Sequence, residues 1–429
     1  MSKNFAIGVI ASSLASIFAS HAMAQSASPA GSVAAGAAPA DAAGSSVAPA
    51  EGYEPVGVRS GSFFIYPGLD VSVSTNDNIY GSPTKTSDTI FGVTPSVTIR
   101  SDWGRNALNV DGRLIGSYYS KRSTENTTAA VLSGNGRIDA DRDWVLFGDA
   151  RAADSYEPRS SAPQTAILTK PTEYNQYTAN GGSTWTLNRF QVTAKIGADN
   201  FKYKNNSIQG GGVYSEAFRD HTAFTGSLRG EWTVSPLTYL FWQIEGNSQQ
   251  YDHAPQPGDV SRKASGYTVL TGARYNLTHL LVGQIGIGYL DQSYKQAGSK
   301  SSSGLAMNTN LTWYATPLVA LTGTASRQVN GSAIQGSPAY VTTSGGLAAA
   351  YEWRRNVSFN VQGSYATDDY NGISRKDTRK QAGAGADWKL NRLAGVYAQY
   401  NYLKQTSVGA SAGRGFDDNT FMVGLRLRR

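Results

Sequence analysis

Apolar and polar residues alternate along most of this sequence, so that every second residue belongs to the same face of an extended chain. Residues 357–366 show the pattern most clearly. Val357, Phe359 and Val361 fall on one face of this segment, and Ser, Asn and Gln residues fall on the other. Such alternation is typical of a β-strand with one apolar side. The segment is therefore predicted to be a strand of this kind.

The same pattern recurs from Val56 onward and predicts about eighteen strands. They span residues 62–75, 88–100, 106–119, 127–140, 144–156, 172–187, 189–203, 220–234, 237–250, 265–276, 279–294, 303–314, 318–329, 339–353, 356–368, 377–389, 393–405 and 417–428. Most exceed the roughly 9 to 11 residues with which a tilted strand crosses a bilayer. No apolar run after Val56 reaches the roughly 18 to 20 residues of a spanning helix, so a membrane protein of this sequence must be a β-barrel.

The connections between the predicted strands alternate in length. Residues 102–105 and 390–392 are examples of tight turns, whereas residues 157–171 and 204–219 are long enough to fold into a barrel and constrict it. Tight turns at one rim and longer loops at the other are typical of outer-membrane barrels. The predicted fold is all-β, a transmembrane antiparallel up-and-down β-barrel of about 18 strands with a polar lumen, formed by residues 56–429.

Charged residues fall on one face of the predicted strands and large apolar residues, such as Leu240, Trp242 and Ile244, fall on the other. A Lys or Arg on the lipid face costs about 2 to 4 kcal/mol at mid-bilayer, so the charged face is predicted to line the lumen. The predicted lumen charges are Asp111, Arg113, Arg137, Asp139, Asp149, Arg151, Lys195, Asp199, Arg229, Glu231, Glu245, Arg274, Glu352, Asp387 and Lys389. Two interpretations stay open: opposed charges select passing solutes, or they pair along the wall and keep the lumen hydrated.

Three aromatic residues are also predicted to face the lumen, each near a polar residue that could bond a sugar hydroxyl. These pairs are Phe147 with Arg151, Phe241 with Glu245, and Tyr397 with Gln399. Aromatic rings stack on sugar faces, so the three are candidates for carbohydrate recognition. Equally, they could fill space beneath a loop that folds inward.

The beginning of the chain has a different character. Lys3, the apolar stretch 5–19 and the small residues Ala22 and Ala24 predict a secretory signal peptide over residues 1–24. Residues 25–55 are rich in Ala, Gly, Ser and Pro, which predicts a flexible periplasmic leader. An alternative role for the leader is a tether to a periplasmic partner.

Composition narrows the functional classes. The 429 residues contain no Cys, which excludes disulfides, thiolate metal sites and a Cys-linked lipid anchor. The net charge of +7 is spread along the chain without a Lys/Arg block, so we expect no nucleic-acid partner. Only 16% of residues are charged although the mean hydropathy is negative, because Ser, Thr, Asn, Gln and Gly supply the polarity. This composition fits a sheet with one wet face.

No pattern of residues predicts catalysis. The three His residues beyond the signal peptide, His221, His253 and His279, fall at loops or strand ends and are interpreted as solvated. None has a spacing that suggests a Ser or Thr nucleophile. Residues 76–78 (Asn-Asp-Asn) offer oxygen atoms but lack the length and spacing of a calcium loop, so a turn is favoured. The sequence predicts no enzyme, no metal site and no cofactor.

The start of the predicted barrel carries a resemblance. Its residues are Ser62-Phe63-Phe64-Ile65-Tyr66-Pro67-Gly68-Leu69, Thr75-Asn76-Asp77-Asn78-Ile79-Tyr80, Thr94-Pro95-Ser96-Val97, Arg100-Ser101-Asp102-Trp103 and Asn106-Ala107-Leu108. This region is similar to the β-barrel porins encoded beside capsule and exopolysaccharide genes in Gram-negative bacteria. The resemblance implies an outer-membrane location and a role in polysaccharide production or export, without catalytic residues.

The expected partners follow from that resemblance and from the barrel itself. Outer-membrane lipid and lipopolysaccharide would surround the wall, and polysaccharide and the periplasmic export machinery are further candidates. Composition alone favours a general diffusion porin for small hydrophilic solutes. A non-conducting structural or adhesive barrel is the remaining alternative.

Overall fold

The computed structural model describes most of the chain after the predicted leader. The described residues are 52–161, 168–255, 259–277, 280–295 and 300–429. The predicted signal peptide 1–24 and most of the leader 25–55 therefore lie outside them, as does His279. Within the described ranges, no helix is long and apolar enough to cross a membrane.

The described residues form one antiparallel sheet of 19 strands. One of them, β1 (Val58–Ser60), pairs only with the beginning of β2, so eighteen strands make up the barrel wall. The wall strands are β2 (Phe63–Asn76), β3 (Asp88–Ser101), β4 (Ala107–Tyr119), β5 (Thr127–Asp139), β6 (Trp144–Tyr156), β7 (Glu173–Leu187), β8 (Phe190–Tyr203), β11 (His221–Ser235), β12 (Thr238–Tyr251), β13 (Ala264–Leu277), β14 (Leu281–Tyr294), β15 (Ser302–Thr316), β16 (Val319–Gly331), β17 (Ala339–Arg354), β18 (Val357–Tyr370), β19 (Lys376–Lys389), β20 (Ala394–Val408) and β21 (Phe416–Arg428).

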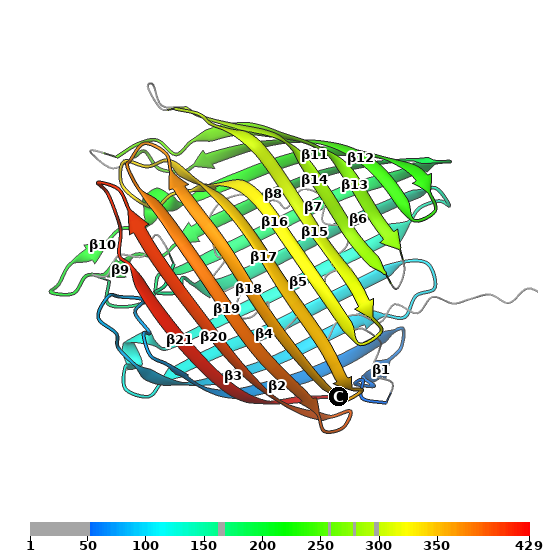
Figure 1. Cartoon of the computed structure of the whole chain (residues 1–429), viewed down its shortest axis with the longest axis horizontal. Helices are drawn as coiled ribbons and strands as arrows, with labels where there is room; N and C mark the ends of the chain where they lie inside the picture. The colour runs from blue at the N-terminus through cyan, green and yellow to red at the C-terminus, as the bar shows by residue number, and fades with distance from the viewer. Residues whose placement is uncertain (1–51, 162–167, 256–258, 278–279, 296–299) are drawn as a thin grey trace, which may run out of the picture.

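Each wall strand pairs with the next wall strand along the chain, which is an up-and-down topology (Figure 1). β8 pairs directly with β11, because the two-residue strands β9 (Asn206–Ser207) and β10 (Val213–Tyr214) form a separate hairpin. β21 pairs with β2, with Leu69 opposite Leu427, and this pairing closes the barrel. The predicted transmembrane β-barrel is confirmed, and its predicted strands correspond to the observed ones with small shifts at their ends.

The barrel has two different ends. The chain terminus at Arg429 and β1 lie at one end, which we call the short-turn end, and β9 and β10 lie at the other, which we call the loop end (Figure 1). Two short 3₁₀ helices also belong to loop-end connections: η2 (Ser123–Glu125) lies between β4 and β5, and η3 (Ala217–Arg219) lies between β8 and β11.

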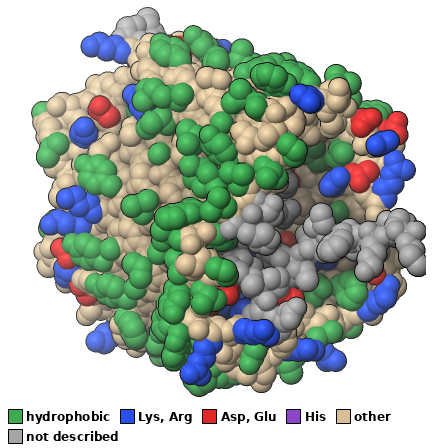
Figure 2. Space-filling view, turned by 45° about the vertical axis from the view of Figure 1, so that its right-hand side comes forward, with side chains coloured by type: hydrophobic (Ala, Val, Ile, Leu, Met, Phe, Trp, Pro, Cys, Tyr) green, Lys and Arg blue, Asp and Glu red, His purple; other side chains and the backbone are tan. Residues whose placement is uncertain are grey.

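The two faces of the wall differ in chemistry, as β12 shows. Leu240, Trp242 and Ile244 are 44–50% exposed, whereas the alternate residues Phe241 and Glu245 are at most 9% exposed. Alternate strand residues point to opposite faces, so the exposed apolar set faces outward and the other set faces inward. Figure 2 shows hydrophobic side chains spread over the wall, with Lys, Arg, Asp and Glu mostly toward its margins. An apolar outer surface suits contact with lipid.

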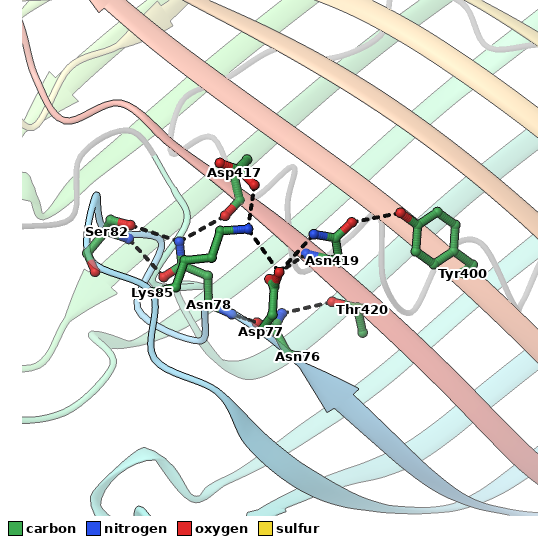
Figure 3. Close-up of polar contacts among 9 residues, drawn as sticks. All are labelled: Asn76, Asp77, Asn78, Ser82, Lys85, Tyr400, Asp417, Asn419 and Thr420. Carbon is green, nitrogen blue, oxygen red and sulfur yellow. Dashed lines mark hydrogen bonds and ion pairs between the residues drawn. The ribbon is translucent and has the colours of Figure 1, made fainter.

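The closing seam is fixed by polar contacts at the loop end (Figure 3). Lys85 binds both Asp77, at 2.9 Å, and Asp417, and so ties the β2–β3 loop to β21. The side-chain amide of Asn419 donates to Asp77 at 2.8 Å. The side-chain amide of Asn78 donates to the Ser82 and Asp417 carbonyls at 2.8 and 2.9 Å. The side-chain oxygens of Asn76 and Asn78 therefore accept hydrogen bonds within the β2–β3 loop, and those of Asp77 accept from Lys85 and from Asn419 of β21.

These seam contacts shift the pKa values of Asp77 and Lys85 in opposite directions. Partial burial raises the pKa of Asp77, but the hydrogen bonds from Lys85 and Asn419 outweigh burial and lower the pKa overall. The hydrogen bonds to Asp417 and Asp77 raise the pKa of Lys85. Both groups are thus held in their charged forms.

Candidate functional site: the inner wall

Strands β11 to β14 carry a cluster of paired charges on their inner face, which we call the charged wall: Arg229, Glu231, Gln243, Arg274 and Gln284. The Arg229 guanidinium donates to Glu231 at 2.8 Å, to Gln243 at 3.2 Å and to Gln284 at 3.0 Å. Arg274 donates to Glu231 at 3.1 Å. Because Arg229 reaches from β11 to β14, its side chain lies along the wall and crosses two strands.

The arginines of the charged wall lie on aromatic rings. The Arg229 guanidinium is 3.9 Å from the centre of the Phe241 ring, and the Arg274 guanidinium is 3.9 Å from that of Tyr239. The Phe241 ring in turn covers Gly286, where an added Cβ would be 3.1 Å from the ring. Cation–π contact on one face and a glycine on the other leave Phe241 buried.

A second cluster of the same design lies beside the closing seam. Arg426 binds Asp70 at 3.4 Å and Asp387 at 3.1 Å, and its guanidinium is 4.8 Å from the centre of the Tyr397 ring. The Tyr397 hydroxyl donates to Asp70 at 2.7 Å. A Cβ on Gly424 would overlap the Tyr397 ring, so only glycine fits beneath it. Stacking of a sugar on Phe241 or Tyr397 would require the covering arginine to move.

The remaining predicted lumen residues are distributed around the wall. Several carboxylates accept a hydrogen bond from a neighbour: Asp111 from Thr98, Asp139 from Arg137, Asp149 from Asn180 and Asp199 from Thr178. Others are close enough for their charges to interact: Arg151 with Arg113 and Asp199, Glu245 with Lys195, and Glu352 with Lys389. Phe147 lies against Gly182 of the neighbouring strand. The structure thus brings Arg229, Glu231, Arg274 and Phe241 together and leaves most of the others in separate pairs.

The sequence reasoning missed a row of rings on the inner face at the loop end, which we call the aromatic row: Tyr203, Tyr174, Phe201, His221 and Tyr251. His221 stacks between Phe201 and Tyr251, with ring centres 4.9 and 4.8 Å apart. Tyr174 lies 6.3 Å from Phe201 and 5.6 Å from Tyr203. The signal available in the sequence was that each residue falls within the last two inward positions at the loop end of its strand.

The interpretation of His221 as a solvated loop residue is wrong. His221 is the first residue of β11 and is 1% exposed, because both faces of its ring are covered. Its Nδ1 lies 2.7 Å from the Arg219 carbonyl oxygen, which fixes the ring orientation. The residue is therefore part of the packing beneath the η3 loop.

The loop-end connections cover the aromatic row and are joined by buried ion pairs, a unit that we call the loop layer. Arg219 of η3 donates to Glu157 at 3.0 Å and to Glu216 at 3.2 Å, and its guanidinium lies 4.0 Å from the centre of the Tyr203 ring. Arg159 binds Glu125 through two hydrogen bonds. Both loops that the sequence singled out, 157–171 and 204–219, thus have described residues in this layer.

Burial has an electrostatic consequence in the loop layer. It raises the pKa of Glu216, an effect that the Arg219 charge opposes and the nearby Glu157 carboxylate reinforces. Over the part of the chain that the structure describes, no three His, Asp or Glu residues are grouped so that they could hold a metal ion.

Comparison with solved structures finds barrels of low similarity. The Pseudomonas aeruginosa protein OpdL is 11% identical with a TM-score of 0.43, and the match covers 86% of this chain and 99% of that one. A mutant of the ferric enterobactin receptor PfeA from the same organism is 9% identical with a TM-score of 0.44, covering 85% and 80% of the two chains. The siderophore receptor PirA from Acinetobacter baumannii is 8% identical with a TM-score of 0.43, and the match covers 85% of this chain and 80% of that one.

The sequence comparisons are more specific. None of the curated proteins matches the chain. A family model described as "Putative beta-barrel porin 2" matches residues 51–429, which include every strand of the barrel. The location of this barrel is the bacterial outer membrane. The chain belongs to this family of porin-type outer-membrane β-barrels.

Proposed function

We propose that the protein is a water-filled channel for hydrophilic solutes, and that its role is passage and not catalysis. The observation that carries this proposal is the inner face of an eighteen-stranded closed barrel, on which charged and amide side chains occupy most strands. A barrel of roughly 16 to 18 strands is wide enough for an aqueous channel. Wall charges that pair with their neighbours keep such a lumen hydrated.

The proposal is tested by planar-bilayer recordings of the full chain. Stepwise conductance is expected. Replacing residues 205–216 of the β8–β11 connection with a short Gly/Ser linker is expected to raise the conductance, because it removes Glu216, which binds the Arg219 that lies on the aromatic row. A silent bilayer for both proteins would overturn the proposal in favour of a structural or adhesive barrel.

A second proposal concerns the solute. The resemblance at residues 62–108 supports polysaccharide as cargo, with the periplasmic export machinery as a partner of the leader 25–55. The aromatic row supports this proposal, because Tyr174 and Tyr251 would offer ring surface to sugars once the loop layer moved aside.

Gene deletion separates the two kinds of cargo. Loss of secreted polymer with unchanged uptake of small sugars is the result expected for polymer export. Normal polymer with slowed sugar uptake would contradict export and support a general diffusion porin. No change in either quantity would point to a structural role.

A further inference from the structure

The inner face of β12 to β14 carries polar side chains whose hydrogen-bonding capacity is not used within the protein. Glu245 is the central one, and its Oε2 is buried and makes no hydrogen bond to any described residue. The same holds for Nε2 of Gln243, Oδ1 of Asn247 and Nε2 of Gln292. Buried polar atoms without partners are rare in folded proteins because each is costly.

The strand register places these four side chains next to one another. Gln243, Glu245 and Asn247 are successive inward residues of β12. Gly266 of β13 lies between Asn247 and Gln292 in the register. A Cβ on Gly266 would overlap the Gln292 amide, so that amide extends across β13 toward Asn247. Glycine at this position therefore allows the amides of β12 and β14 to approach one another.

Among the described residues, no cation forms an ion pair with the Glu245 carboxylate that would offset its burial. The cation whose charge acts on it is Lys195 of β8, and Ser227 of β11 lies between them in the register. Neighbouring strands are about 4.8 Å apart, so the backbones of Glu245 and Lys195 are separated by about 10 Å. In contrast, Glu231, which lies nearer the short-turn end of the same inner face, forms ion pairs with Arg229 and Arg274.

An apolar floor adjoins the carboxylate. Leu270 of β13 is opposite Gln243 in the register, and Leu290 of β14 adjoins Thr268, which is opposite Glu245. Both leucines are buried and pack in one cluster with Phe241 and Ala306. The site thus combines one negative charge, several amide groups and an alkyl surface.

We propose that Gln243, Glu245, Asn247 and Gln292 form a binding site for a small organic ammonium solute on the inner wall. The ammonium group would donate charge-assisted hydrogen bonds to Oε2 of Glu245 and Oδ1 of Asn247, the two unpartnered acceptors, and its alkyl part would lie on Leu270 and Leu290. A single carboxylate matches a monovalent charge, and the alkyl surface distinguishes an organic cation from an inorganic one. The site lies within the lumen of the proposed channel and in that respect rests on the proposed function.

The test is a ligand-observed NMR titration of the detergent-solubilised full chain with n-butylammonium, and with 1-butanol as the uncharged counterpart. Saturable binding of the ammonium and at least tenfold weaker binding of the alcohol are expected. Glu245→Gln keeps the side-chain shape and is expected to weaken ammonium binding at least tenfold, which corresponds to about 1.4 kcal/mol. Gln292→Leu is expected to weaken it severalfold.

Glu352→Gln is the matched control, because Glu352 is an inward carboxylate on the distant strand β17. It is expected to leave binding unchanged. The proposal is overturned if the wild-type protein does not bind the ammonium, if the alcohol or a neutral polyol binds equally well, or if Glu245→Gln has no effect. Conductance is recorded in a separate experiment. If the barrel binds the ammonium but does not conduct, only the proposed channel function is contradicted. If it conducts but does not bind the ammonium, only the proposed binding site is contradicted.

Discussion

The two ends of strand β12 line the barrel in different ways. Near the short turns, Gln243 belongs to the charged wall and Phe241 lies under its Arg229, and the arginines of this wall pair with residues of adjacent strands. At the loop end, Tyr251 belongs to the aromatic row and is covered by the loop layer. The first region is built from contacts between adjacent strands, and the second depends on loops that are distant in sequence.

The comparison shows that the interior is held in place by two kinds of interaction. The charged wall holds its arginines against the sheet through contacts between adjacent strands. The loop layer places buried ion pairs above apolar rings, where one lost partner leaves a charge uncompensated. We therefore expect the loop layer to be more sensitive to single substitutions, while the charged wall should control which ions pass.

The largest effect is expected from Arg219→Leu. The substitution leaves Glu157 and Glu216 buried without their common cation, which costs about 3 to 5 kcal/mol. The η3 loop should then detach from the aromatic row and become sensitive to trypsin, whereas the barrel should keep its sheet-dominated circular dichroism. An η3 loop as resistant as in the wild type would contradict the assignment of Arg219 as the central residue of this layer.

Two carboxylate variants sharpen that prediction. Glu157→Gln should destabilise the η3 loop more than Glu216→Gln, because the raised pKa of Glu216 means that burial already disfavours its charge. A carboxyl group whose pKa is raised by folding stabilises the folded state at pH values below its ordinary pKa of 4.5. That stabilisation is lost as the pH rises through the raised pKa. The difference between the two variants should therefore be largest at neutral pH, as measured by the rate of trypsin cleavage.

A smaller effect is expected from Phe241→Ala. The buried ring fills the space between Arg229 and Gly286, and its removal should cost about 3 kcal/mol. The midpoint of denaturant-induced unfolding in detergent measures this loss. Phe147→Ala is the matched comparison, because Phe147 is an inward aromatic that is only partly buried, and it should cost less. Equal losses would mean that the covering arginine contributes nothing.

Glu231→Gln should change ion selectivity more than stability. The charged wall holds two arginines and one glutamate, so the loss of their shared carboxylate raises its net charge from +1 to +2. The permeability ratio of chloride to potassium should rise severalfold, as measured by the reversal potential in a salt gradient. An unchanged ratio would place the selective part of the lumen elsewhere.

The smallest effect concerns the seam and depends on pH. Because the pKa of Asp77 is lowered in the folded protein, its carboxylate stabilises the seam at pH values above the ordinary pKa of 3.8. This stabilisation is lost as the pH falls below 3.8 and the carboxylate is protonated. Hydrogen–deuterium exchange should show that residues 76–87 lose protection in this acidic range. Asp77→Asn should remove the pH dependence, and a persistent loss of protection in that variant would assign the transition to another group.

Strand alternation predicted the barrel because it is a local pattern that each strand repeats. It also placed charged residues such as Arg229 and Glu231 on one face, since they are two positions apart on β11. Alternation could not reveal that Arg229 reaches Gln284 or that Phe241 lies on Gly286, because these contacts depend on the register of several strands. The pairing of Arg219 with Glu157 joins two loops and has no periodic signal in the sequence.

The most direct test of the central claim, a polar inner face that surrounds a water-filled lumen, uses the absence of Cys from the chain. Single cysteines are introduced as Arg151→Cys on the predicted inner face, Tyr251→Cys beneath the loop layer and Ile244→Cys on the outer face. Their reaction rates with a charged methanethiosulfonate reagent are measured in lipid vesicles. The account predicts fast reaction at position 151, slow reaction at 251 and none at 244. Fast reaction at 244 together with none at 151 would contradict it.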